Sequence, residues 1–125
     1  QVAKGEKNAG IIRDYFESEK IIYPSNAFRM RFTSNHDENS WNGTEYERMG
    51  EAAETFAALS FVIPGQPLIY TGQEVALDRR LNFFEKDPIK WTEHKISKFY
   101  SNLLKTIDIV FKVIFVISGL LISLR

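Results

Sequence analysis

The chain has 125 residues, 44% of them hydrophobic and 26% charged, which is the size and composition of one modest globular domain. Its 16 basic and 16 acidic residues cancel and form no block of like charge, so we expect no nucleic-acid or polyanionic partner. The absence of cysteine excludes disulfides, thiol nucleophiles and thiolate metal sites, but it leaves a secreted, periplasmic or cytoplasmic localisation open.

A helix is predicted over residues 8–20. Apolar residues recur there at spacings of three and four, which is typical of an amphipathic helix, and these residues are Ile11, Ile12, Tyr15 and Phe16. The chain begins with Gln1 rather than methionine, and no apolar signal-peptide core precedes the helix. We therefore expect the true amino terminus to lie elsewhere.

A strand is predicted over residues 28–34, because apolar residues alternate with arginines after a turn. The strand ends in a group of hydrogen-bonding and ionisable side chains, Asn35, His36, Asp37 and Glu38. Ligands bind outside the carboxyl ends of strands in parallel α/β folds, so this group is a candidate site. Two other interpretations stay open: Asn and Asp side chains that cap a turn, and a metal site, which lacks a second histidine at a ligand spacing.

A second helix is predicted to begin at Thr44, because the Thr-x-x-Glu pattern that Thr44 forms with Glu47 is typical of a capping box. Residues 39–43 before it are expected to form a loop. The helix should end near Phe61, with Glu45 directed away from its packed face. That face is predicted to consist of Tyr46, Met49, Ala53, Phe56, Ala57 and Ser60.

The apolar run of residues 67–70 predicts a buried parallel strand, with Gln73 and Glu74 at its carboxyl end. After a long loop, a third helix is predicted from residue 93 or 94, and its inward face should consist of Ile96, Phe99, Tyr100, Leu103 and Leu104. Strands that alternate with helices indicate parallel βα units with right-handed crossovers, so the predicted fold class is α/β.

The composition changes sharply at residues 107–125, which are mostly Ile, Val, Leu and Phe, and we treat them as a tail separate from residues 1–106. The uninterrupted apolar part, residues 113–124, is shorter than the roughly 20 residues that a membrane span needs. Three interpretations of the tail stay open. These are a buried helix or strand, a truncation or reading-frame artefact, and a membrane contact through residues 109–124 with Lys112 snorkelling to the interface.

Two runs resemble motifs of a known enzyme family. Residues 32–37 read Phe-Thr-Ser-Asn-His-Asp, and residues 64–74 read Pro-Gly-Gln-Pro-Leu-Ile-Tyr-Thr-Gly-Gln-Glu. These runs resemble the seventh-strand and eighth-strand motifs of the alpha-amylase family of glycoside hydrolases, in the same order. Residues 83–91 resemble the loop before the last helix of that family's barrel. The resemblance covers residues 9–104 and leaves the apolar tail unmatched.

The resemblance implies a partial (β/α)8 TIM barrel, from about the sixth helix through the eighth strand and helix, with the site at the carboxyl ends of the strands. It implies that Asp37 stabilises the oxocarbenium-like transition state and that His36 and Asn35 bind the same sugar. Trp41 either stacks on a sugar ring or covers the helix below it. Glu74 is expected to organise the base of the site through hydrogen bonds.

The resemblance further implies an enzyme that hydrolyses or transfers α-glucosidic bonds of starch, maltodextrin or maltooligosaccharides with retention. In that family the nucleophile and the general acid come from the fourth and fifth strands, so this chain alone is expected to be inactive. Asp14 has the wrong context for either role. Arg79 and Arg80 either line the cleft or are solvated, and solvation is the favoured interpretation. No cofactor is evident and no metal ligand is assigned, although calcium in the complete enzyme stays open. The alternatives are a non-catalytic carbohydrate-binding module and a small membrane-associated polypeptide.

Overall fold

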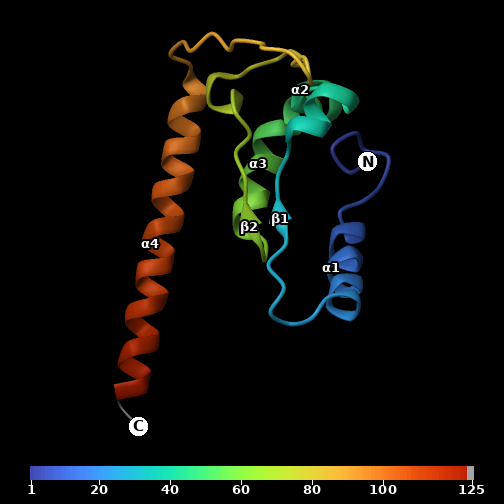
Figure 1. Cartoon of the computed structure of the whole chain (residues 1–125). Coiled ribbons are helices and arrows are strands. Elements are labelled where there is room, and N and C mark those ends of the chain that lie inside the picture. The colour runs from blue at the N-terminus through green and yellow to red at the C-terminus, as the bar shows by residue number, and fades with distance from the viewer. Residues whose placement is uncertain (124–125) are drawn as a thin grey trace.

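The computed structural model describes the backbone of residues 1–123 and the side chains of residues 1–110. Over this range the chain forms a small mixed α/β structure with four α-helices and a two-stranded parallel sheet (Figure 1). The α-helices are α1 (Gly10–Ile22), α2 (Glu45–Met49), α3 (Ala53–Val62) and α4 (Lys95–Ser123). The strands are β1 (Met30–Arg31) and β2 (Gln66–Pro67), and the short turns are η1 (Glu38–Asn42), η2 (Gly50–Ala52) and η3 (Gln73–Val75).

The two strands pair in parallel, as predicted, with Met30 opposite Gln66 and Arg31 opposite Pro67. Both strands are shorter than predicted. Hydrogen bonds between the strands extend only to the Arg29 carbonyl and the Leu68 amide, and beyond Leu68 and Arg31 side chains bind some of the backbone groups. Arg48 donates to the Thr33 carbonyl, and the side-chain oxygen of Gln73 accepts from the Tyr70 amide at 2.6 Å. Both strands run toward the end of the molecule that carries α2, so their carboxyl ends lie together (Figure 1).

The first predicted helix is confirmed as α1. The second was predicted as one continuous helix, which is wrong, because the chain forms α2 and α3 with η2 between them. The predicted capping box is present, since Thr44 accepts from the Glu47 amide at 3.1 Å and the Glu47 carboxylate accepts from the Thr44 amide at 2.7 Å. The helix is interrupted at Gly50, whose φ of +55° leads into the tight turn η2 before α3 begins. The loop predicted over residues 39–43 is also wrong for most of its length, because residues 38–42 form the π-type turn η1.

The core joins α3 and α4. Ala57 of α3 and Ile96 and Tyr100 of α4 are buried against one another, with Ile69, Ala76 and Phe99 packed around them. The predicted inward face of α4 is thus confirmed for Ile96 and Tyr100, whereas Leu104 is half exposed and was wrongly assigned to it. The backbone of the predicted tail continues α4 to Ser123.

Membrane contact was predicted as one alternative for residues 109–124, and the side chains from residue 111 onward lie outside the described residues. Within the described part of the chain, no helix is long and apolar enough to cross a membrane. The division of the chain at residue 106 falls inside α4.

A buried ion pair joins α1 to the sheet at the amino ends of the strands. Both terminal nitrogens of Arg31 donate hydrogen bonds to the Glu19 carboxylate. Only a tenth of each of the two side chains is exposed. Arg31 also donates to the Pro64 carbonyl at 2.8 Å, and Arg29 lies 3.2 Å from Glu19. The hydrogen bonds that Arg31 donates to Glu19 lower the pKa of Glu19 to about 2, and the Glu19 carboxylate in turn raises the pKa of Arg31.

Acidification should weaken this pair. Because the pKa of Glu19 is lowered from 4.5 to about 2, its contribution to stability is complete above about pH 4.5 and is lost as the pH falls toward 2. Protonated Glu19 resembles glutamine, so urea-unfolding midpoints of the wild type and Glu19→Gln should converge as the pH is lowered through this range. A difference between the two proteins that stayed constant on acidification would contradict the prediction.

Candidate functional site

The predicted site residues follow β1, where the chain turns into η1. The side-chain oxygen of Asn35 accepts from the Glu38 amide at 2.8 Å, so Asn35 caps this turn, as one interpretation of the cluster expected. His36 and Asp37 instead direct their side chains outward, 65% and 60% exposed, with Nε2 of His36 3.5 Å from Oδ2 of Asp37. The structure therefore brings an imidazole and a carboxylate together at an accessible position.

A buried polar cluster lies behind this turn and joins four elements. Thr33 donates to the Glu45 carboxylate at 2.7 Å, and the Gln73 amide donates to Thr33 at 2.7 Å, to Tyr100 at 3.2 Å and to Glu45. Burial raises the pKa of Glu45 and that of Tyr100. The cluster ties the carboxyl end of β1 to α2, η3 and α4, and so supports the turn that carries His36 and Asp37.

The position of Glu45 corrects the sequence-based expectation. Glu45 was expected to point away from the packed face of its helix, but it is 4% exposed because Thr33 and Gln73 supply hydrogen bonds to it. Its role was missed because both donors belong to other elements. The sequence signal that could have found it is the pair of polar residues at the two strand ends, Thr33 and Gln73.

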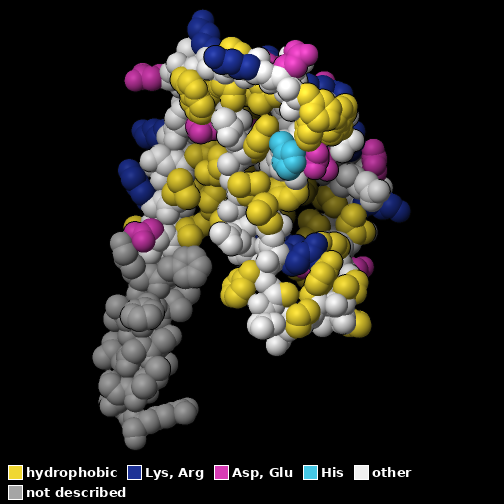
Figure 2. All heavy atoms as spheres, in the orientation of Figure 1, with side chains coloured by type: hydrophobic (Ala, Val, Ile, Leu, Met, Phe, Trp, Pro, Cys, Tyr) yellow, Lys and Arg dark blue, Asp and Glu magenta, His cyan; other side chains and the backbone are white. Residues whose placement is uncertain are grey.

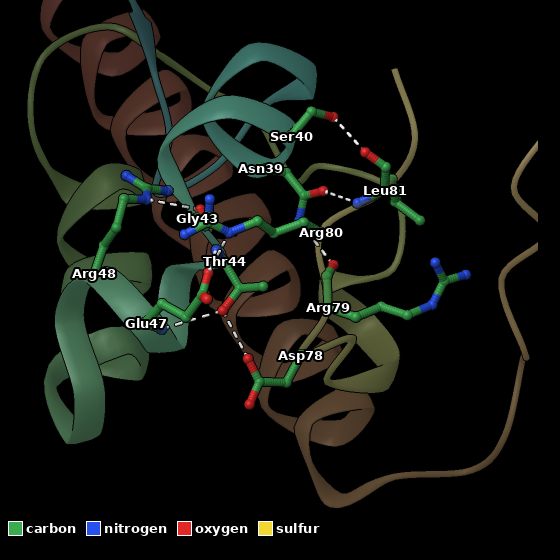
Figure 3. Close-up of polar contacts among 10 residues, drawn as sticks. All are labelled: Asn39, Ser40, Gly43, Thr44, Glu47, Arg48, Asp78, Arg79, Arg80 and Leu81. Atoms are coloured by element: carbon green, nitrogen blue, oxygen red, sulfur yellow. Dashed lines mark hydrogen bonds and ion pairs between the residues drawn. The ribbon is translucent and has the colours of Figure 1, made fainter. Parts of the chain in front are cut away.

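Hydrogen bonds fasten the segment after η3 to η1 and α2 (Figure 3). Asn39 donates to the Arg79 carbonyl at 3.2 Å and accepts from the Leu81 amide at 2.7 Å, and Ser40 donates to the Leu81 carbonyl at 2.7 Å. Thr44 donates to Asp78 at 2.6 Å. Parts of the chain that follow the two different strands are therefore joined into one surface.

Two arginines on this segment form ion pairs. Arg80 donates to Glu47 at 3.0 Å, and Arg79 contacts Asp87 at 2.7 Å, with both arginine side chains nearly half exposed. The hydrogen bond from Arg80 lowers the pKa of Glu47, and the one from Arg79 lowers the pKa of Asp87 to about 2. Both arginines are exposed, as expected for solvated side chains, and each also forms an ion pair.

An exposed aromatic cluster adjoins His36. The ring of Phe83 lies 5.6 Å from that of His36, 5.3 Å from that of Trp41 and 4.8 Å from that of Phe84. Trp41 is 58% exposed and contacts rings from the segment after β2. Figure 2 shows hydrophobic and acidic side chains beside an imidazole on this face of the molecule.

Glu74 was predicted to organise the base of the site through hydrogen bonds. Its carboxylate accepts from the Gly72 amide at 2.9 Å, and its backbone carbonyl accepts from Ser97 at 2.6 Å, which ties η3 to α4. Among the described residues, no group of three or more His, Asp or Glu side chains is placed to hold a metal ion.

No family model matches the chain, and no solved structure matches it. In an alignment 105 residues long that covers 82% of this chain, it is 32% identical to "Alpha-amylase MalA" of Haloarcula japonica, and the chain spans only 15% of that protein's length.

This similarity relates the chain to the glycoside hydrolases. More narrowly, the resemblance that the two strand-end motifs predicted is confirmed, because the chain is a distant homologue of part of an alpha-amylase.

Proposed function

We propose that the chain is the part of an alpha-amylase-type glycosidase barrel that runs from about the sixth helix through the eighth strand and helix. The observation that carries the proposal is the parallel pairing of β1 and β2, which sets the two motif segments side by side at the carboxyl ends of the strands. In the complete enzyme the reaction is hydrolysis or transfer of α-glucosidic bonds in starch, maltodextrin or maltooligosaccharides, with retention.

In this proposal Asp37 is the carboxylate that stabilises the oxocarbenium-like transition state and holds the sugar hydroxyls. The Asp37 side chain is 60% exposed and so is accessible to a ligand, and His36 at 3.5 Å can donate to the same sugar. Asn35 shapes the turn through its cap to the Glu38 amide, and we assign it to the same sugar. Trp41 supplies an aromatic face beside them.

The nucleophile and the general acid would come from outside this chain. A retaining glycosidase needs two carboxyl groups about 5–5.5 Å apart across the scissile bond. Glu45 is buried in hydrogen bonds to Thr33 and Gln73, and Glu74 binds the Gly72 amide, so neither is presented to a sugar. We assign both roles to the preceding strands of the proposed barrel.

Exposed apolar side chains support the idea that further strands and helices cover this chain. Ile21 is 88% exposed, Phe28 84% and Val62 72%, which is unusual for large hydrophobic residues. A two-stranded sheet also leaves one edge of each strand unpaired among the described residues. A closed barrel would bury these edges and side chains.

The purified chain should not hydrolyse maltoheptaose. Without the nucleophile and the general acid, stabilisation by Asp37 alone cannot open a glycosidic bond. Release of reducing ends would be followed over days against an authentic alpha-amylase as positive control. Turnover by the chain that disappears in Asp37→Asn would overturn the assignment of the missing roles to other strands.

A non-catalytic carbohydrate-binding module is the second candidate, and the exposed aromatic cluster of Trp41, Phe83 and Phe84 favours it. The DNA upstream of the coding segment distinguishes the two. An Asp at the end of a predicted fourth strand and a Glu at the end of a predicted fifth strand would support the enzyme. An upstream reading frame that encodes neither residue would support the binding module.

A further inference from the structure

We propose that Arg48 is a positioning residue, which fixes the turn that carries His36 and Asp37. It does so by taking a backbone carbonyl away from the sheet and by holding the turn at both of its ends. The contacts of Arg48 stand on the geometry alone, whereas their consequence for catalysis rests on the proposed function.

The hydrogen bonds between the two strands stop one step before the candidate site. The amides of Gln66 and Leu68 donate at 2.8 Å to carbonyls two residues apart on the opposite segment, the second of which is that of Arg31. Hydrogen bonds between parallel strands are evenly spaced, at every second residue. The next one would therefore join the Tyr70 amide to the Thr33 carbonyl.

Side chains from two other elements take both partners of that next hydrogen bond. Arg48 of α2 donates to the Thr33 carbonyl, and the side-chain oxygen of Gln73 accepts from the Tyr70 amide at 2.6 Å. The two backbone groups are thus satisfied without each other. The sheet ends at this level, and the chain after Thr33 leaves it toward η1.

Arg48 also holds the turn at its beginning and at its end. Its Nε donates to the Gly43 carbonyl at 3.0 Å (Figure 3), and its Nη1 lies 3.4 Å from the Glu38 carboxylate. One guanidinium therefore contacts residues before, within and after the segment that carries the site. Only a quarter of the Arg48 side chain is exposed, so these contacts are partly shielded from water.

Gln73 supports the same point from the segment after the second strand. Its side-chain nitrogen donates to the Thr33 hydroxyl at 2.7 Å and to Glu45, while its oxygen accepts from the Tyr70 amide. Because both ends of this side-chain amide are engaged, its orientation is fixed. Thr33 is thus held through its hydroxyl by Gln73 and through its carbonyl by Arg48.

The two site residues depend on this support because they have little packing of their own. The side chains of His36 and Asp37 are 65% and 60% exposed. Their directions are therefore set chiefly by the backbone of the turn. In an enzyme, a misplacement of about 1 Å costs on the order of 10²-fold in rate.

Hydrogen exchange of the full chain, followed by NMR, tests the role of Arg48. The Glu38 amide donates to the side-chain oxygen of Asn35, and the Asn39 amide donates to the Asn35 carbonyl, so both report on the turn. Arg48→Lys keeps the positive charge, but its donors sit on one nitrogen and cannot reach all three acceptors. Exchange of both amides should become about tenfold faster, while amides of α1 are unchanged.

Arg80→Lys is the matched control. Arg80 also binds α2, through an ion pair with Glu47 at 3.0 Å, and an ammonium can still form a single contact of this kind. Exchange at the Glu38 and Asn39 amides should therefore match that of the wild type. Circular dichroism of both variants reports whether the fold is kept.

A second measurement uses the wild-type chain and so does not depend on the folding of a variant. The Nε–H of Arg48 donates to a backbone carbonyl on a side chain that is 25% exposed. The Nε–H of Arg13 donates to Asp14 on a side chain that is 78% exposed. The Arg48 proton should exchange with water about tenfold more slowly than the Arg13 proton, and equal rates would count against the proposed contacts.

The outcomes separate this inference from the proposed function. Equal exchange in Arg48→Lys, Arg80→Lys and the wild type would overturn the role of Arg48 and leave the function standing. Faster exchange of all amides alike, those of α1 included, would make Arg48 a general stabilising residue and would also overturn it.

Kinetics of the complete enzyme test the catalytic consequence. Arg48→Lys should lower kcat on maltoheptaose by about tenfold or more and change KM less, whereas Arg80→Lys should change neither. Equal kcat values for the two variants, together with the local exchange effect, would keep the structural role and remove its effect on the reaction. The function itself is decided separately, by the encoded upstream strands.

Discussion

Replacing Arg31 with alanine should lower the free energy of unfolding by about 3 kcal/mol, which is the low end for breaking a buried ion pair because a tenth of each side chain stays exposed. The substitution leaves the Glu19 carboxylate buried with only Arg29 beside it at 3.2 Å. It also removes the hydrogen bond to the Pro64 carbonyl, which connects the start of β2 to β1. Domains are stable by only about 5–15 kcal/mol, so this loss is a large part of the total stability.

Urea unfolding followed by circular dichroism measures the effect of Arg31→Ala. The control is Arg13→Ala, since Arg13 pairs with Asp14 on the surface with 78% of its side chain exposed, and its loss should cost less than about 0.5 kcal/mol. Arg31→Lys should recover only part of the stability, because an ammonium cannot form the two-pronged contact with Glu19. Equal midpoints for Arg31→Ala and Arg13→Ala would show that the pair does not hold α1 to the sheet.

Replacing Asp37 with asparagine in the complete enzyme that we propose should lower kcat by about 10²–10³, the range found when one preorganised electrostatic group is removed from a transition state. Asparagine keeps the size of the side chain and one acceptor oxygen but not its negative charge, so KM should change less than kcat. Steady-state kinetics on maltoheptaose give both constants. The expected signature is therefore a larger change in kcat than in KM.

The control for this substitution is Asp14→Asn. Asp14 is similarly exposed, at 67% against 60% for Asp37, but it lies on α1 away from the strand ends. Its replacement should leave both constants within twofold of the wild type, as expected for a surface change distant from the site. A kcat for Asp37→Asn that matched Asp14→Asn would remove Asp37 from the reaction.

Features that depend on neighbouring residues were predictable from the sequence. The apolar spacing that begins at Ile11 predicted α1, and the Thr44 to Glu47 pattern predicted the capping box. Both rest on contacts between residues three or four positions apart, which the chain forms wherever it is helical. The order of the elements was also sufficient to predict that β1 and β2 are parallel.

Features that depend on distant residues were mispredicted or missed. Glu45 was assigned to the exposed side of its helix, because helical periodicity does not reveal that Gln73 would reach it from the segment after β2. The strands were predicted too long, because Arg48 occupies the Thr33 carbonyl that a longer strand would have used. The break at Gly50 was overlooked because the apolar stripe continues on both sides of it.

By itself, the sequence determined the relation to alpha-amylases and the position of the Asn35-His36-Asp37 run after a strand, because motif order and local patterning are properties of the chain alone. Only the tertiary structure decided that Phe83 lies against His36 and Trp41 and that a buried cluster supports this turn. Those contacts join residues that follow different strands. They form because the parallel pairing of β1 and β2 brings both carboxyl ends to the same end of the sheet.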